Sequence, residues 1–226
     1  MDEKQYLIYE CNNPDCGLRF PGYTGIPKWN RCPACRSIIR VVARVNYSAE
    51  KNTRIAIESK HQVYALLDNI RSAWNVGSIF RTSDGAGIKK IYLCGITPTP
   101  ENLKVGKTAL GAEQSIPWEK SLNGVKTVNR LKTQGNRLWV LEDTPEAEPL
   151  FQINIEKTDY PIVLVVGNEV TGVDPGILEL CDKVVSIPMI GNKQSYNVAI
   201  AFSIAASFLL YRQSDSHLSC KIFPNT

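Results

Sequence analysis

The feature that most constrains the fold is the alternation of short apolar runs with amphipathic stretches, which begins near His61. The alternation favours a mainly parallel β-sheet with helices on its faces, an α/β fold. In such a sheet, ligands bind at the loops beyond the carboxyl ends of the strands. The runs typical of strands are 63–69, 89–95, 136–143, 161–167 and 183–189, and those typical of helices are 75–87, 107–114, 123–135 and 175–182.

The size and composition of the chain are those of an ordinary soluble protein. Its 226 residues suffice for one sizeable α/β domain and a small extra module, and its mean hydropathy is −0.16. The first ten residues lack the layout of a signal peptide. The longest nearly apolar run, residues 198–211, contains Ser203 and Ser207 and is too short to span a bilayer. We therefore expect a cytoplasmic protein without membrane contact, whose seven cysteines are reduced or bind metal.

Four cysteines form two close pairs near the start of the chain. Cys11 and Cys16 are separated by four residues, Cys32 and Cys35 by two, and a 15-residue insert lies between the pairs. This spacing predicts a structural zinc site, which would supply folding energy to a segment too poor in apolar residues to form a core. Disulfides and unrelated buried thiols are the alternatives, and the compartment and the paired spacing disfavour them. We expect a zinc-ribbon-like module over 1–45, a linker over 46–60 and the main domain over 61–226.

The positive charge of the chain is concentrated near its start. Residues 1–60 carry 10 Lys and Arg against 6 Asp and Glu, whereas the remaining residues carry 16 of each. This placement favours a polyanionic partner such as RNA, although a solvated surface would look the same. The insert between the cysteine pairs mixes basic and aromatic residues, among them Arg19, Phe20, Lys28 and Trp29. They could contact RNA or simply pack a hairpin, and both possibilities remain open.

Three polar loops of the main domain follow or precede apolar runs, within 68–87, 165–176 and 186–197. The glycines in these loops would let the backbone approach a ligand, or would only form turns. The chain contains neither G-x-G-x-x-G nor G-x-x-x-x-G-K-[ST], which disfavours a dinucleotide fold and a P-loop. The positions of the two histidines, His61 and His217, disfavour a nucleophile triad. The glycines in question are Gly77, Gly167, Gly172 and Gly191.

The same three loops carry a family resemblance. The segments "NVGSIFRTSDGAG", "VVGNEVTGVD" and "IPMIGNKQSYNVAIA" resemble, in this order, the three signature motifs of the SpoU/TrmH family of RNA ribose 2′-O-methyltransferases, in the SPOUT superfamily. The resemblance covers residues 61–212. It implies a parallel sheet with a C-terminal trefoil knot, the cofactor S-adenosylmethionine and a homodimer. The four-cysteine module is not a general feature of that family.

The resemblance also implies site residues. Asn75 and Arg81 match the first motif, Glu169 matches the second, and Ser195 and Asn197 match the third; these are the candidate catalytic residues. The family usually has Ser-Leu-Asn in the third motif, so Tyr196 is a departure. The candidate cofactor-binding residues are Gly167, Asn168, Glu169, Gly172, Ile187, Met189, Gly191, Ser195, Asn197 and Ala199.

Simpler roles compete for several of these residues. Ser195 and Asn197 precede the apolar run 198–211, where plain helix capping would explain both. The resemblance implies that Arg81 is the base that takes the hydroxyl proton. It could instead clamp a phosphate or the ribose, with Glu169 as a charge partner, or be a surface charge on a helix. A free guanidinium stays protonated far above neutral pH, so we favour the clamp and leave the base role open. The apolar residues of 198–211 surround the helix axis, which predicts burial in a two-fold interface.

The sequence thus favours an S-adenosylmethionine-dependent methyltransferase acting on the ribose 2′-hydroxyl of tRNA or rRNA. The alternatives are a non-enzymatic zinc-ribbon RNA-binding protein on the same scaffold, and a SPOUT enzyme that methylates a base.

Overall fold

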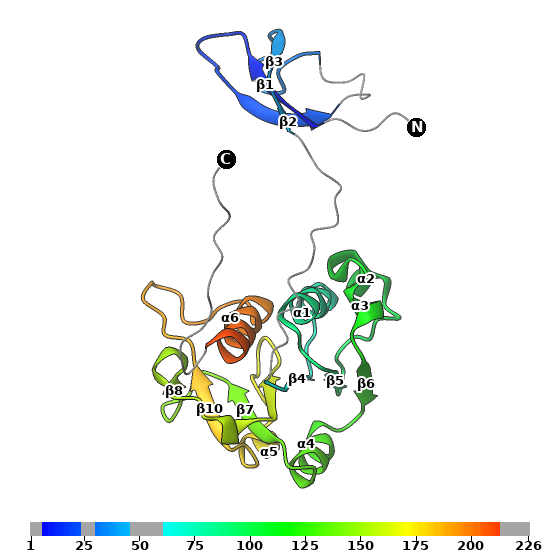
Figure 1. The fold of residues 1–226 in the computed structure, drawn as a ribbon, viewed down its shortest axis with the longest axis vertical. Helices are drawn as coiled ribbons and strands as arrows, with labels where there is room; N and C mark the ends of the chain where they lie inside the picture. Colours follow the sequence, from blue (N-terminus) through cyan, green and yellow to red (C-terminus); the bar gives the residue numbers. More distant parts are fainter. Residues whose placement is uncertain (1–5, 24–29, 46–60, 213–226) are drawn as a thin grey trace. The chain divides into compact units, whose positions relative to one another are not determined.

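The structure is a computed structural model that describes residues 6–23, 30–45 and 61–212 (Figure 1). The chain divides into two compact units, Met1–Ile57 and Glu58–Thr226. The expected linker, 46–60, lies outside the described residues. No helix within the described ranges is long and apolar enough to cross a membrane.

The first unit contains a three-stranded antiparallel sheet. β1 (Tyr6–Cys11) lies between β2 (Arg19–Tyr23) and β3 (Ile39–Val45). Glu10 pairs in register with Arg19 on one side and Arg40 on the other, and it forms ion pairs with both, at 3.6 and 2.5 Å. The ring of Phe20 stacks on that of Tyr9, with 5.7 Å between the centroids. Two residues of the insert, Arg19 and Phe20, are therefore used within the sheet.

The second unit is built on a seven-stranded sheet in which the strands described here all pair in parallel, as the alternation predicted. The strand order is β6-β5-β4-β9-β7-β10-β8. Its central strands are buried on both faces, which explains their continuous apolar sequences. The strands are β4 (Val63–Asp68), β5 (Ile91–Cys94), β6 (Trp118–Ser121), β7 (Arg137–Leu141), β8 (Glu148–Pro149), β9 (Ile162–Val166) and β10 (Lys183–Ser186).

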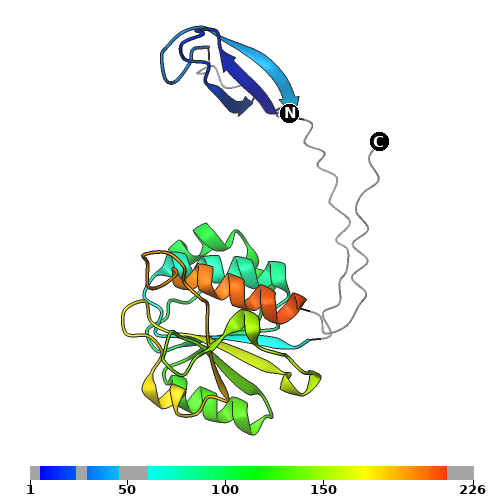
Figure 2. The same ribbon diagram turned by 90° about the vertical axis from the view of Figure 1, so that its left-hand side faces the viewer.

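Helices cover both faces of this sheet. α1 (Ala73–Ala86) and α6 (Val198–Tyr211) lie side by side on one face, and α4 (Gly124–Thr133) and α5 (Pro175–Leu178) lie on the other (Figure 2). β9 shows why two layers form, because its residues alternate between the two hydrophobic cores. α2 (Leu103–Ala109) packs on α1 and leads into α3 (Ala112–Ser115), while two 3₁₀ turns, η1 (Leu150–Gln152) and η2 (Lys157–Asp159), follow β8.

The last two strands enter the sheet between strands that precede them in the chain. β9 lies between β4 and β7, and β10 lies between β7 and β8. α6 then returns to pack on α1 and on the central strands β4, β7 and β9. The chain therefore reaches the edge of the sheet and comes back to its middle. The trefoil knot itself stays an expectation from the resemblance.

The helical segment expected over 107–114 is broken in two. Leu110 and Gly111 both adopt a left-handed conformation, with φ of 53° and 95°, and they separate α2 from α3. The helix expected over 175–182 ends at Leu178, because Leu180 and Cys181 already form turn hydrogen bonds back to Ile177 and Leu178. The sequence did not indicate β6 or β8, which have four and two residues.

Candidate functional site

The loops that follow β4 and β9 lie side by side at the carboxyl edge of the sheet. These two strands are neighbours, yet the chain proceeds from β4 toward β5 and β6 and later returns to place β9 on the other side. The Asn168 side chain joins the loops by donating from Nδ2 to the Asn69 carbonyl at 2.7 Å. A reversal of strand order of this kind is where open α/β sheets bind ligands.

Glu169 connects the second motif to the first. Its carboxylate accepts from the Arg71 amide at 2.9 Å, the Ser72 amide at 3.1 Å and Asn75 Nδ2 at 2.9 Å, all at the start of α1. Partial burial alone would raise the pKa of Glu169. The three hydrogen bonds outweigh that effect and lower it, so the group is a carboxylate at neutral pH.

Asn197 connects the third motif to the same cluster. Its Nδ2 donates to Asn75 Oδ1 at 3.1 Å, and its Oδ1 accepts from the Ala199 amide at 3.0 Å. The second bond makes Asn197 the N-cap of α6, as predicted. Ser195 is two residues before this cap and does not cap the helix; it is exposed beside the cavity described next. Asn75, Glu169 and Asn197 thus form one hydrogen-bonded cluster drawn from all three motifs.

A cavity of about 360 Å³ opens next to this cluster. Its volume is within the range of small-molecule sites, and its walls combine apolar side chains with three carboxylates. Seven of the candidate cofactor-binding residues line it: Gly167, Asn168, Glu169, Ile187, Met189, Ser195 and Asn197.

The other three candidates lie outside this lining. The backbone of Gly172 pairs with that of Asn168 through hydrogen bonds of 3.0 Å in both directions, so it closes the loop. Gly191 is exposed in the loop before α6, and Ala199 is buried in the first turn of α6. Gly172 therefore acts on the site through the loop that it closes, and Ala199 lines the second cavity described below.

Several residues that line the cavity carried no prediction. Glu142 and Asp143 directly follow β7, and Gln194 and Tyr196 flank Ser195. Glu142 Oε2 also accepts from the Val173 amide at 3.0 Å, which ties the end of β7 to the loop after β9. The signal that could have found the two acids was their place at the carboxyl end of the expected strand 136–143.

Arg81 does not join the hydrogen-bonded cluster. It is exposed on α1 and lines a second cavity, of about 350 Å³, together with Asn75 and Asn197. Both carboxylate oxygens of Glu169 accept from the start of α1 instead, and the ion pairs found among the described residues do not include the expected pairing with Arg81.

Two of the glycines have packing roles in the chain itself. A Cβ on Gly77 would lie 2.2 Å from the Val105 carbonyl oxygen, so this glycine lets α1 and α2 approach closely. A Cβ on Gly167 would lie 2.3 Å from the Val173 nitrogen, inside the folded loop after β9. At both positions a side chain would clash with backbone, so these glycines serve close packing, whereas the sequence interpretation weighed only ligand contact and turn formation.

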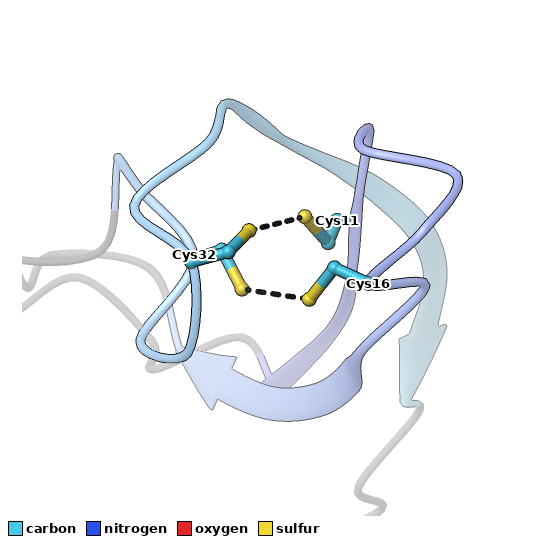
Figure 3. Close-up of side chains that lie close together, drawn as sticks. Cys11, Cys16 and Cys32 are labelled. Carbon is cyan, nitrogen blue, oxygen red and sulfur yellow. Dashed lines mark hydrogen bonds between the residues drawn. The ribbon is translucent and has the colours of Figure 1, made fainter.

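In the first unit, the four paired cysteines converge. Their sulfurs all lie within 4.8 Å of one another, and Figure 3 shows those of Cys11, Cys16 and Cys32 turned toward a common centre. The sulfurs of Cys11 and Cys35 are 3.4 Å apart, and those of Cys16 and Cys32 are 3.8 Å apart. Both distances are much longer than the S–S bond of a disulfide. Four sulfurs at about 2.3 Å from a tetrahedral zinc would be separated by about 3.8 Å. Hydrogen bonds from Ser37 lower the pKa of Cys35 to about 6, whereas burial raises the pKa of Cys11 to about 12, so of these two thiols only Cys35 is a thiolate at neutral pH before a metal binds.

Comparison with known proteins gives the same family as the motifs. The model of the SpoU rRNA Methylase family matches residues 62–207. The tRNA (guanosine(18)-2′-O)-methyltransferase of Aquifex aeolicus is 31% identical over 160 residues, which are 68% of this chain and 72% of that protein. The 23S rRNA (guanosine-2′-O-)-methyltransferase RlmB of Vibrio parahaemolyticus is 29% identical over 168 residues, 73% of this chain and 66% of the relative.

Solved structures agree. The AdoMet-bound rRNA methyltransferase of Sinorhizobium meliloti superposes with a TM-score of 0.61 at 27% identity, covering 66% of this chain and 55% of that one. The Aquifex aeolicus TrmH/SpoU tRNA modifying enzyme superposes with a TM-score of 0.59 at 29% identity, covering 67% and 76%. The chain therefore spans between about half and three quarters of these relatives. With the family model matched over most of the second unit and the three motifs gathered at one edge of its sheet, this chain belongs to the SpoU rRNA Methylase family.

Proposed function

We infer that this chain is an S-adenosylmethionine-dependent RNA methyltransferase that transfers a methyl group to a ribose 2′-hydroxyl. The observation that carries the inference is the cluster of Asn75, Glu169 and Asn197 beside a cavity of about 360 Å³, in a chain of this family. Relatives named as tRNA and 23S rRNA 2′-O-methyltransferases, and a neighbour with bound AdoMet, support the reaction and the cofactor. We propose tRNA or rRNA as the substrate.

The cavity fits this cofactor chemically. Leu141, Val166 and Ile187 provide apolar walls for the adenosyl group, while Glu142 and Glu169 provide negative charge for a sulfonium cation. When bound, S-adenosylmethionine supplies an electrophilic methyl group on that sulfonium. The residues of this chain would hold and align the reactants, since such a displacement depends on proximity and orientation.

We propose distinct roles for the two cavities that meet at Asn197. Residues from Gly167 to Glu169, Ile187, Met189 and Ser195 would hold the cofactor in the first cavity. Arg81 would clamp the RNA in the second, and Asn75 and Asn197 would form the wall at which the hydroxyl meets the methyl group. In this arrangement the clamp role suits Arg81 better than the base role, because a guanidinium holds its proton at neutral pH.

Two further parts of the proposal concern the whole protein. We propose that Cys11, Cys16, Cys32 and Cys35 bind one structural zinc ion, which the clustering of their sulfurs supports.

We also propose a homodimer in which α6 lies at the interface. One side of α6 is buried in the chain, whereas Ile200, Ser207 and Tyr211 are exposed. An apolar groove that includes Ile204, Phe208 and Phe151 runs along this side. In addition to these two parts, we propose that the protein is located in the cytoplasm.

The test is methyl transfer from labelled S-adenosylmethionine to separated tRNA and rRNA fractions. We expect the wild-type chain to label one fraction and Arg81→Ala to label neither, while both proteins bind the cofactor with similar affinity because Arg81 lies outside the first cavity. Wild-type protein that binds the cofactor but labels no RNA would favour the non-enzymatic alternative.

A further inference from the structure

The second cavity has a charge opposite to that of the first. Among the described residues, its lining contains the cations Arg81 and Lys107, the hydroxyls of Ser78, Thr82, Thr108 and Ser203, and no aspartate or glutamate. The described residues that line the first cavity include Glu142, Asp143 and Glu169 and no lysine, arginine or histidine. Asn197 belongs to both linings. The two cavities therefore present an anionic and a cationic surface on either side of one residue.

Lys107 reaches this cavity from α2, an element that carries none of the family motifs. Close packing fixes α2 on α1, because Gly77 leaves no room for a Cβ against the Val105 carbonyl. The Thr108 hydroxyl also donates to the Trp74 carbonyl at 3.0 Å. Lys107 is exposed in the last turn of this helix, and it forms none of the ion pairs found among the described residues. The lysine is thus held on a rigid element with its charge available.

We propose that Lys107 is a phosphate-binding residue, which together with Arg81 holds one backbone phosphate of the RNA in the second cavity. This rests on the proposed function. Phosphate oxygens are strong acceptors for both side chains, and the Ser78 hydroxyl in the lining can donate to the same group. In RNA the 2′-hydroxyl is on the carbon next to the one that carries the 3′-phosphate. A phosphate held between Arg81 and Lys107 therefore brings the neighbouring hydroxyl toward Asn197 and the first cavity.

The experiment compares Lys107→Gln with Lys104→Gln in the full chain, with total tRNA as the probe. Lys104 is one turn earlier on α2, is also exposed and does not line the cavity. Losing one phosphate contact should reduce the slope of log K against log salt by about 0.7 to 0.9. The affinity ratio of wild type to Lys107→Gln should then fall about threefold between 50 and 200 mM salt. Lys104→Gln should match the wild type, and Lys107→Arg should retain the slope.

Cofactor binding distinguishes a phosphate site in the second cavity from a site for the carboxylate of the cofactor. We expect the affinity of Lys107→Gln for S-adenosylmethionine to be within about twofold of that of the wild type. Its kcat/KM for RNA should be lower than that of the wild type. Equal salt slopes for Lys107→Gln and the wild type would overturn the proposal. A loss of cofactor affinity with unchanged RNA binding would also overturn it, because the cavity would then hold the cofactor's carboxylate. Measuring RNA binding across salt concentrations needs no methyl transfer. It therefore tests whether Lys107 contacts a phosphate even if the proposed reaction fails.

Discussion

Substitutions of Asn197 test two roles of one side chain, the N-cap of α6 and the hydrogen bond to Asn75. Asn197→Ala removes both the cap on the Ala199 amide and the bond to Asn75. The cap contributes about 1 kcal/mol. The bond to Asn75 joins exposed side chains and contributes about 0.5 to 1 kcal/mol. The variant should therefore lose about 1.5 to 2 kcal/mol, and a domain of this size should lose about 3 to 8 °C in Tm.

Asn197→Ser is the matched variant, because serine caps helices as well as asparagine but is too short to reach Asn75. It should lose only about 0.5 to 1 kcal/mol, or about 1 to 4 °C. Calorimetric unfolding of the full chain measures both Tm values. Titration with the cofactor should show weaker binding to both variants, since Asn197 lines the first cavity. If the serine variant were as unstable as the alanine variant, the cap would not have the value assigned to it.

Three other predictions concern the metal, the assembly and pH. Elemental analysis should find one zinc per chain and none in Cys32→Ser; freshly purified, reduced wild type without zinc would contradict the site assigned to the four sulfurs. Sedimentation should show a dimer that Ser207→Glu dissociates, since Ser207 is exposed on the apolar side of α6; a wild-type monomer at micromolar concentration would count against the interface. Because its hydrogen bonds lower the pKa of Glu169, its contribution to stability is complete above the unfolded value of 4.5 and is lost as pH falls through the folded value. The stability gap to Glu169→Gln should therefore shrink below pH 4.5, and a gap that grew on acidification would refute this.

The sequence was sufficient for those features that local chemistry decides. An asparagine directly before an apolar helical run predicts an N-cap, and Asn197 is one. Alternating runs predict a parallel sheet, and the strands of the second unit pair in parallel within the described residues. Paired cysteines predict a four-sulfur cluster, and the four sulfurs converge. Such patterns do not distinguish tRNA from rRNA as the substrate.

Features that depend on distant parts of the chain could not be predicted. Nothing local to β9 says that it inserts between β4 and β7, since any buried strand has the same composition. Gly77 resembles a turn glycine in the sequence, but its reason is the carbonyl of Val105 on a later helix. Leu110 breaks the expected helix in a left-handed conformation that leucine rarely adopts. Glu142 resembles any acid at the end of a strand in the sequence, and only the fold shows that it accepts from the Val173 amide and lines the cavity.

The position of the transferred methyl group tests the central claim most directly. Total RNA would be incubated with the full chain and labelled S-adenosylmethionine, then digested with alkali and, separately, to single nucleosides. A 2′-O-methyl group removes the hydroxyl that alkali uses to cleave the chain. The account predicts label in alkali-resistant dinucleotides and in ribose-methylated nucleosides, and none with Arg81→Ala. Label on a base, or equal labelling by Arg81→Ala, would contradict it.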